Sequence, residues 1–183
     1  MVHRRLGVVA VLLIAVATGG CTPGPAAATP RPAAATYEEY FVAACAAWDA
    51  MFRAVGNPDT ASGSDLSRAL DAAMEAGDGA SAERAAAAMV RELRAGREQV
   101  AIARGWAPRT AVMAQLDRVL AAFEVGVAAK LAVAKGEPSA VNPQAAFEGA
   151  GGLEAWFAML EAMRAAGSGA ATDPSCPNTG ISP

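Results

Sequence analysis

The sequence has 183 residues and a formal net charge of −3, with 54% of its residues hydrophobic and 18% charged. This length fits one domain of about 100–200 residues with appended segments. A mildly acidic chain without a block of like charges lacks the basic surface of a nucleic-acid-binding protein, and that class is excluded.

The N-terminal segment has the three parts of a secretory signal peptide. Arg4 and Arg5 precede an apolar run from Leu6 to Ala17, and small residues follow up to Cys21. The run is too short for a transmembrane helix, which needs roughly 20 residues. We therefore expect residues 1–20 to be removed on export, which leaves a mature chain more acidic than its precursor.

Gly19-Gly20-Cys21 resembles the lipobox of bacterial lipoproteins, in which a diacylglyceryl group is attached to the cysteine thiol before cleavage. The resemblance covers the signal segment alone. It implies cleavage between Gly20 and Cys21, a lipid on Cys21, and a protein anchored at the extracytoplasmic face of the cell membrane. Thr18 stands where the lipobox usually has an aliphatic residue, and Ala15-Val16-Ala17 offers an ordinary cleavage site instead. On that alternative the protein is soluble and secreted.

The three cysteines favour the lipid anchor. Lipidation of Cys21 leaves Cys45 and Cys176 as a pair, whereas ordinary cleavage leaves an odd thiol in an oxidising compartment. The Pro- and Ala-rich residues 21–36 are expected to form an extended tether. A disulfide between Cys45 and Cys176 would hold the C-terminal tail, residues 167–183, against the first helix. On the chain-entropy model it would stabilise the fold by up to about 5 kcal/mol.

From residue 37 to residue 166 the apolar residues recur at helical spacing. Thr36 and Glu39 predict a capping box at the start of the first helix. Gly105 is expected in the left-handed conformation that ends a helix, and Pro108 in the first turn of the next. Helices are expected up to Val55, around Leu66–Met74, from about Ser81 to Arg104, from about Pro108 to Lys135, and after Asn142-Pro143 with an interruption near Gly149–Gly152.

No segment shows the two-residue alternation of a strand, so the sequence predicts an all-α fold. Long amphipathic helices with short connections favour an up-and-down helical bundle of about four main helices plus a short one. We expect this bundle to occupy residues 37–166, with a disulfide-tethered C-terminal tail. The many alanines are typical of closely packed helices, and they limit the apolar surface that the core can bury.

The single histidine, His3, lies in the predicted signal peptide, so the mature chain has none. Ser-His-Asp and Cys-His catalytic arrangements, and zinc or haem sites with a histidine ligand, are therefore excluded. No phosphate-binding loop is present, and the glycines at 149–152 are better explained as a helix interruption. We expect neither an enzyme nor a protein with a resident metal or cofactor.

Four groups of residues carry alternative functional interpretations. Three are an apolar-ligand pocket lined by Trp48, Trp106, Trp156 and Phe157; a haem site at Tyr37 and Tyr40; and a calcium site at Asp59 and Asp65. In an alanine-rich core, large aromatic residues more often fill space.

The fourth group is a set of arginines that could hold an anionic ligand or lipid headgroups: Arg84, Arg91, Arg94, Arg97 and Arg104. The simpler interpretation is a solvated helix face on which these arginines alternate with Glu83, Glu92 and Glu98. On that face Arg94 lies four residues from Glu98.

The sequence alone leaves two functions open. The first is a non-catalytic interaction module of the cell envelope that contacts another protein or the cell wall. The alternative is a carrier or sensor of a small apolar ligand bound between the helices. No nucleic-acid partner is expected.

Overall fold

The computed structural model describes residues 33–57, 63–167, 175–177, 179–181 and 183. Within these ranges the chain is all-helical and contains no strand, so the predicted fold class is confirmed. The elements in chain order are α1 (Tyr37–Val55), α2 (Asp65–Glu75), α3 (Gly79–Ala103), the 3₁₀ helix η1 (Ala107–Arg109), α4 (Thr110–Ala134), α5 (Pro143–Gly149) and α6 (Gly152–Ala165).

Side-chain caps determine where α1 and α3 begin. Thr36 Oγ1 accepts the Glu39 N–H at 3.2 Å, and Glu39 Oε2 accepts the Thr36 N–H at 3.2 Å, which confirms the predicted capping box. The third helix begins at Gly79, ahead of the expected Ser81. The reason is that Asp78 takes the N-cap position and accepts the Ser81 N–H at 3.0 Å.

Gly105, between α3 and η1, has a different role from the expected one. Its φ is not positive, so the prediction of a left-handed helix end at this residue was wrong. A Cβ at Gly105 would lie 2.5 Å from the Ala33 Cβ and 2.8 Å from the Ala34 oxygen. The absence of a side chain makes room for the segment that precedes α1. Pro108 lies in η1, the first turn of the next helical segment, as expected.

The segment before α1 packs against the end of α3. Ala34 is buried, and its N–H donates to the Ile102 carbonyl at 2.9 Å. Residues 33–36, which the sequence assigned to an extended tether, therefore lie against the helices.

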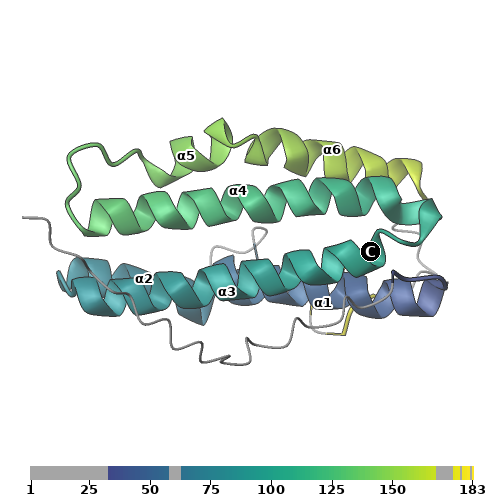
Figure 1. Ribbon diagram of the computed structural model, residues 1–183, viewed down its shortest axis with the longest axis horizontal. Helices are drawn as coiled ribbons and strands as arrows, with labels where there is room; N and C mark the ends of the chain where they lie inside the picture. The colour runs from purple at the N-terminus through teal and green to yellow at the C-terminus, as the bar shows by residue number, and fades with distance from the viewer. Residues whose placement is uncertain (1–32, 58–62, 168–174, 178, 182) are drawn as a thin grey trace, which may run out of the picture. The chain divides into compact units, whose positions relative to one another are not determined.

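The helices pack in chain order around α3 and α4, which the short connection through η1 makes antiparallel (Figure 1). α3 contacts α1, α2 and α4, and α4 also contacts α5 and α6. Trp48 on α1 meets Trp156 on α6 edge to face, with ring centroids 6.3 Å apart. The helices thus form two groups, α1 to α3 and α4 to α6. The contact between α3 and α4 joins the two groups.

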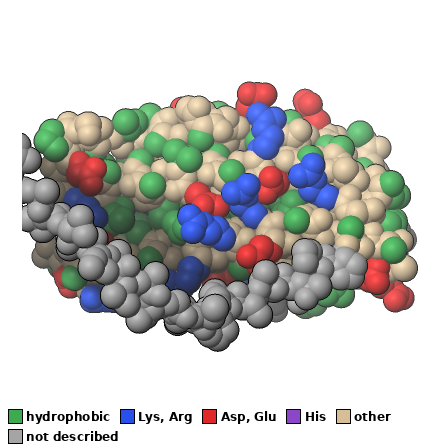
Figure 2. Space-filling model, in the orientation of Figure 1, with side chains coloured by type: hydrophobic (Ala, Val, Ile, Leu, Met, Phe, Trp, Pro, Cys, Tyr) green, Lys and Arg blue, Asp and Glu red, His purple; other side chains and the backbone are tan. Residues whose placement is uncertain are grey.

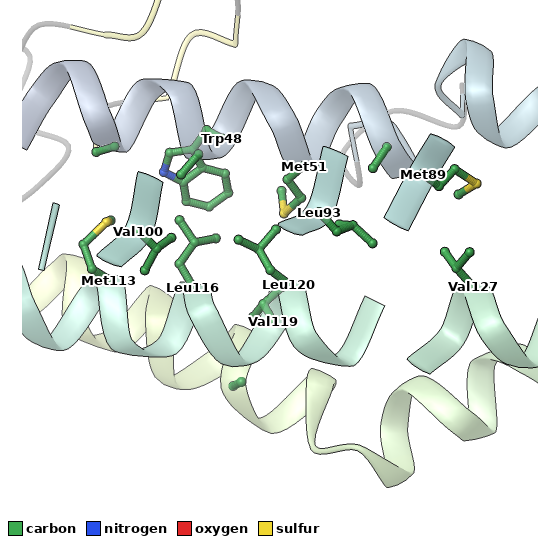
Figure 3. Close-up of a cluster of buried hydrophobic side chains, with 14 of the residues drawn as sticks. Trp48, Met51, Met89, Leu93, Val100, Met113, Leu116, Val119, Leu120 and Val127 are labelled. Carbon is green, nitrogen blue, oxygen red and sulfur yellow. The ribbon is translucent and has the colours of Figure 1, made fainter. Parts of the chain in front are cut away.

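Side chains from α1, α3 and α4 form the centre of the core (Figure 3). Small residues let α1 and α3 approach closely: a Cβ at Gly96 would lie 3.3 Å from the Ala47 oxygen and from the Ala50 Cβ. The largest fully buried side chains include Tyr40, Trp48, Met51, Leu70, Leu93, Met113, Leu116, Leu120 and Met159.

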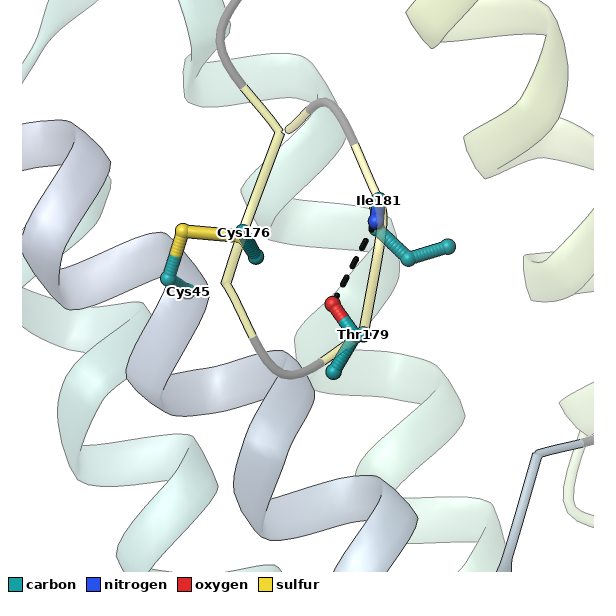
Figure 4. Close-up of a disulfide and its surroundings, with 4 residues drawn as sticks. All are labelled: Cys45, Cys176, Thr179 and Ile181. Atoms are coloured by element: carbon teal, nitrogen blue, oxygen red, sulfur yellow. Dashed lines mark hydrogen bonds between the residues drawn. A yellow bond between two sulfur atoms is a disulfide. The ribbon is translucent and has the colours of Figure 1, made fainter.

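A disulfide joins Cys45 in α1 to Cys176, 131 residues further along the chain (Figure 4). This pairing was predicted and is confirmed. The Cys176 N–H donates to the Ile181 carbonyl at 2.7 Å, and the Ile181 N–H donates to Thr179 Oγ1 at 3.3 Å. Ile181 packs against the hydrophobic core. The bond therefore holds a short turn of the C-terminal tail against the helices.

Candidate functional site

A pocket of about 350 Å³ lies among the helices, with walls from α1 to α6. Its volume falls at the lower end of the range of about 300–1,000 Å³ that is usual for small-molecule sites. Most of the lining is apolar or aromatic, and these residues are Val55, Met89, Phe123, Val127, Pro143, Phe147, Leu153 and Trp156.

Three polar side chains also line the pocket: Ser67 from α2, Lys130 from α4 and Gln144 from α5. Lys130 Nζ lies 2.5 Å from an oxygen of Asp71 on α2. Gln144 Nε2 donates to Glu148 Oε1 at 2.7 Å. The site therefore combines a large apolar wall with a few polar groups, which is the usual chemistry of a small-molecule site.

The α5 wall depends on Phe147 and on Gly152, which leaves space for its ring. The Phe147 and Phe123 rings have centroids 4.7 Å apart. A Cβ at Gly152 would overlap the Phe147 ring, and a Cβ at Gly126 would lie 3.6 Å from the Phe147 Cβ. The chain turns between α5 and α6 at Gly151, whose φ is +76°, so the predicted helix interruption is confirmed. None of the residues of α5 is buried.

The structure brings together part of the aromatic set that the sequence indicated. Trp156 lines the pocket, and Trp48 packs against it from the core. Trp106 instead packs against Tyr40, with ring centroids 4.8 Å apart, and Phe157 is 57% exposed. These two residues lie outside the pocket lining.

Phe147 is the pocket residue that sequence reasoning missed most clearly. Its neighbours on the short α5 show no helical apolar face, so no periodic signal could have found it. Other lining residues that sequence reasoning missed include Met89 and Val127, because helical spacing alone does not indicate which helix faces meet at a pocket.

Two of the arginines of α3, Arg94 and Arg97, pair with acidic residues of α4. Arg97 Nε lies 2.9 Å from Asp117 Oδ1, and Arg94 Nε lies 3.2 Å from Glu124 Oε2. The interpretation in which Glu98 pairs with Arg94 is thus replaced by a contact between helices. The hydrogen bond that Arg97 donates to Asp117, together with the negative charge of that carboxylate, raises the pKa of Arg97. Figure 2 shows basic and acidic side chains interspersed on this face, which is typical of a solvated surface.

Tyr37 and Tyr40 take part in an aromatic cluster with Trp106 at the start of α1. Tyr40 is fully buried, and Arg109, also buried, donates a hydrogen bond to the Ala166 carbonyl. Burial raises the pKa of the Tyr40 hydroxyl, and the positive charge of Arg109 opposes this rise. Since desolvation disfavours the phenolate, these contacts fit a core tyrosine better than a haem ligand.

The acidic residues of the described ranges form no group of three or more that could hold a metal ion. Asp65 is exposed and forms an ion pair with Arg68, three residues further along α2. Asp59, the other residue of the predicted calcium site, lies outside the described residues.

The predicted export and anchoring residues also lie outside the described part of the chain. They include His3, the Ala15-Val16-Ala17 site, Gly20 and Cys21. Among the helices that the structure describes, none has the length and apolar character that a membrane span requires.

No protein-family model, curated protein or solved structure matches this chain.

Proposed function

We propose that this chain is a lipid-anchored extracytoplasmic protein of the cell envelope that binds a small apolar molecule and catalyses no reaction. The pocket between the helices carries this proposal, because its aromatic and aliphatic walls suit an apolar ligand. Of the two functions that the sequence left open, the pocket favours the carrier or sensor over the interaction module.

The proposed anchor rests on the signal-peptide pattern of residues 1–20 and on the cysteines. Pairing of Cys45 with Cys176 supports export, because disulfides persist outside the cytoplasm, and it leaves Cys21 for the lipid. Inhibition of lipoprotein signal peptidase is expected to accumulate the full-length precursor in the membrane. Normal processing under that block would refute the anchor and favour cleavage after Ala17.

We also propose that the helices form an up-and-down bundle whose four members are α1, α3, α4 and the α5–α6 pair. The order of contacts supports this arrangement, since α1 packs on α3, α3 on α4, and α4 on α5 and α6. Contact between Trp48 and Trp156 closes the ring between α1 and α6. Such bundles commonly place ligand sites between facing helices.

An interaction module is the second candidate, and exposed apolar side chains favour it. Leu153 and Phe157 lie four residues apart on α6 and are 43% and 57% exposed. Val42 on α1 is 69% exposed. Neighbouring exposed apolar residues are a usual feature of protein-binding surfaces.

Native mass spectrometry of the exported protein tests the carrier function. A retained small molecule is expected in the wild-type protein and should be lost from Gly126→Leu, because the new side chain extends into the pocket from α4. A Cβ at Gly126 meets its nearest neighbours at 3.5 Å and 3.6 Å, which is ordinary contact, so the helix should tolerate the substitution.

Val125→Leu is the matched control. Val125 lies next to Gly126 on α4, is exposed, and lies outside the pocket lining. This variant should retain the molecule at the wild-type level. If the wild-type protein showed only the mass of the chain and bound no apolar compound on titration, the carrier function would be wrong and the interaction module would replace it.

A further inference from the structure

The charge on the pocket wall is positive. Among the described residues that line it, Lys130 is the single charged side chain, and none is acidic. Ser67 and Gln144 supply the remaining polar side chains. A ligand that matches this wall has a long apolar part and one anionic end, since a carboxylate forms a charge-assisted hydrogen bond with an ammonium group.

Lys130 stands at the end of an apolar stripe on α4. Phe123 and Val127 precede it on the same helix face, at spacings of seven and three residues, and both line the pocket. The Lys130 side chain lines the pocket and is 24% exposed, so it contacts both the pocket and water. An extended chain lying along this stripe would bring its end to Lys130.

The present partner of Lys130 leaves room for a second anion. Asp71 Oδ1 accepts from the ammonium group at 2.5 Å, and the Asp71 side chain is 51% exposed. An ammonium group has three donors, so Lys130 can bind a ligand carboxylate beside Asp71 or in its place. Because Asp71 is well solvated, releasing it to water carries a small penalty.

We infer that the ligand is a free single-chain anionic amphiphile of the fatty-acid type, with its acyl chain in the pocket and its carboxylate on Lys130. This inference rests on the proposed function and specifies the ligand class of the same pocket. The apolar lining and the volume of about 350 Å³ fit one chain. A cationic amphiphile would meet Lys130 with like charge.

Calorimetric titration with decanoate and with decanol, its neutral counterpart, tests the assignment. The chain from residue 21 onward, carrying Cys21→Ser and exported by a separate ordinary signal peptide, serves as the reference protein, because it has neither lipid nor signal segment and needs no detergent that would compete for the pocket. Lys130→Gln is expected to weaken decanoate binding by about tenfold or more, the usual loss for a charge-assisted hydrogen bond. Binding of decanol should change by less than about twofold, because no charged contact is lost.

Two further variants separate the headgroup contact from general effects of charge. Lys135→Gln makes the same charge change at the C-cap of α4, but the Lys135 Nζ pairs with Glu83 at 2.7 Å outside the pocket lining, so decanoate affinity should stay unchanged. Asp71→Asn removes the competing carboxylate and should tighten decanoate binding. A purely structural role of the Lys130–Asp71 pair would instead weaken binding in both Lys130→Gln and Asp71→Asn.

The outcomes distinguish a failure of the anionic-headgroup assignment from a failure of the proposed carrier function. Equal binding of decanoate and decanol, with both unaffected or equally weakened by Lys130→Gln, would overturn the anionic headgroup and leave the apolar pocket intact. Absence of binding by either compound to the reference protein would overturn the proposed carrier function as well.

Discussion

The two sides of α4 meet their neighbours in different ways. Toward α1 and α3, Leu116 and Leu120 are fully buried, the first beside Trp48 and the second beside Met51 (Figure 3). Toward α5, Phe123 is partly exposed and shares a pocket with Phe147, and α5 buries none of its own residues. One helix thus contributes to a closed core on one side and to an open pocket on the other.

This difference indicates that stability and binding are separable in this chain. Close packing against α3 supplies contacts that any loss of volume would disrupt. The α5 side leaves space unfilled, which costs packing contacts and provides room for a ligand. Substitutions on the closed side should therefore change the free energy of unfolding, and those on the pocket side should mainly change ligand affinity.

The largest expected effect is on the closed side. Trp48→Ala removes a fully buried side chain and should lower the free energy of unfolding by about 3–5 kcal/mol, from lost burial and the cavity left behind. Leu153→Ala, at the exposed rim of the pocket, should cost less than about 1 kcal/mol. Denaturant unfolding measures both. Equal losses in the two variants would remove the distinction between the sides.

Removal of the disulfide should have the next largest effect. The double variant Cys45→Ala and Cys176→Ala should lose about 2–5 kcal/mol, because the unfolded chain regains the entropy of a long loop. Thermal unfolding with and without a reductant provides the comparison, since reduced wild-type protein should resemble the variant. Decanoate affinity below the unfolding temperature should stay the same, and a large loss of affinity would show that the tail supports the pocket.

Phe147→Ala addresses the pocket side directly. The ring contacts Phe123 from a half-buried position, so its loss should cost only about 1–2 kcal/mol of stability. Ligand affinity should fall by a larger factor than the stability loss implies, because the α5 wall loses its apolar surface. Calorimetry and chemical unfolding on the same preparation give both values, and a variant that unfolds as readily as Trp48→Ala would contradict the comparison.

The smallest expected effect is on how the Tm depends on pH, and it comes from the Glu39 cap at the start of α1. Backbone N–H groups of Ala35 and then Thr36 hold the pKa of Glu39 below its ordinary value of 4.5. Because the folded-state pKa is depressed, this contribution is present above pH 4.5 and is lost as the pH falls through the folded value. Glu39→Gln should therefore lower the Tm at pH 7 slightly and reduce its fall toward pH 3. A parallel fall in the variant and the wild type would argue against the cap.

Much of the fold could be predicted from the sequence because its signals are local. Thr36 and Glu39 form the expected capping box, and the glycines at 149–152 interrupt the last helical stretch as expected. The disulfide followed from the number of cysteines. Gly105 misled the prediction because its neighbour in space, Ala33, comes from a distant part of the sequence.

The pocket could not be predicted because it depends on contacts between distant segments. Phe147 takes its position from the space that Gly152 leaves, and no local sequence signal links this glycine to Phe147. Helical periodicity identifies the face on which a residue lies but not its partner on another helix. For that reason Arg94 was matched with its own helix, whereas its ion pair is with Glu124 on α4.

Hydrogen exchange followed by mass spectrometry, with and without decanoate, tests the central claim most directly. In the free protein, amides of α5 should exchange much faster than those of α3, because buried contacts are sparse in α5. Decanoate should slow exchange in α5 and in the adjoining part of α4, and should change α3 much less, since α3 contributes Met89 alone to the pocket lining. Equal protection of α5 and α3 in the free protein, or no change on adding the ligand, would contradict the account.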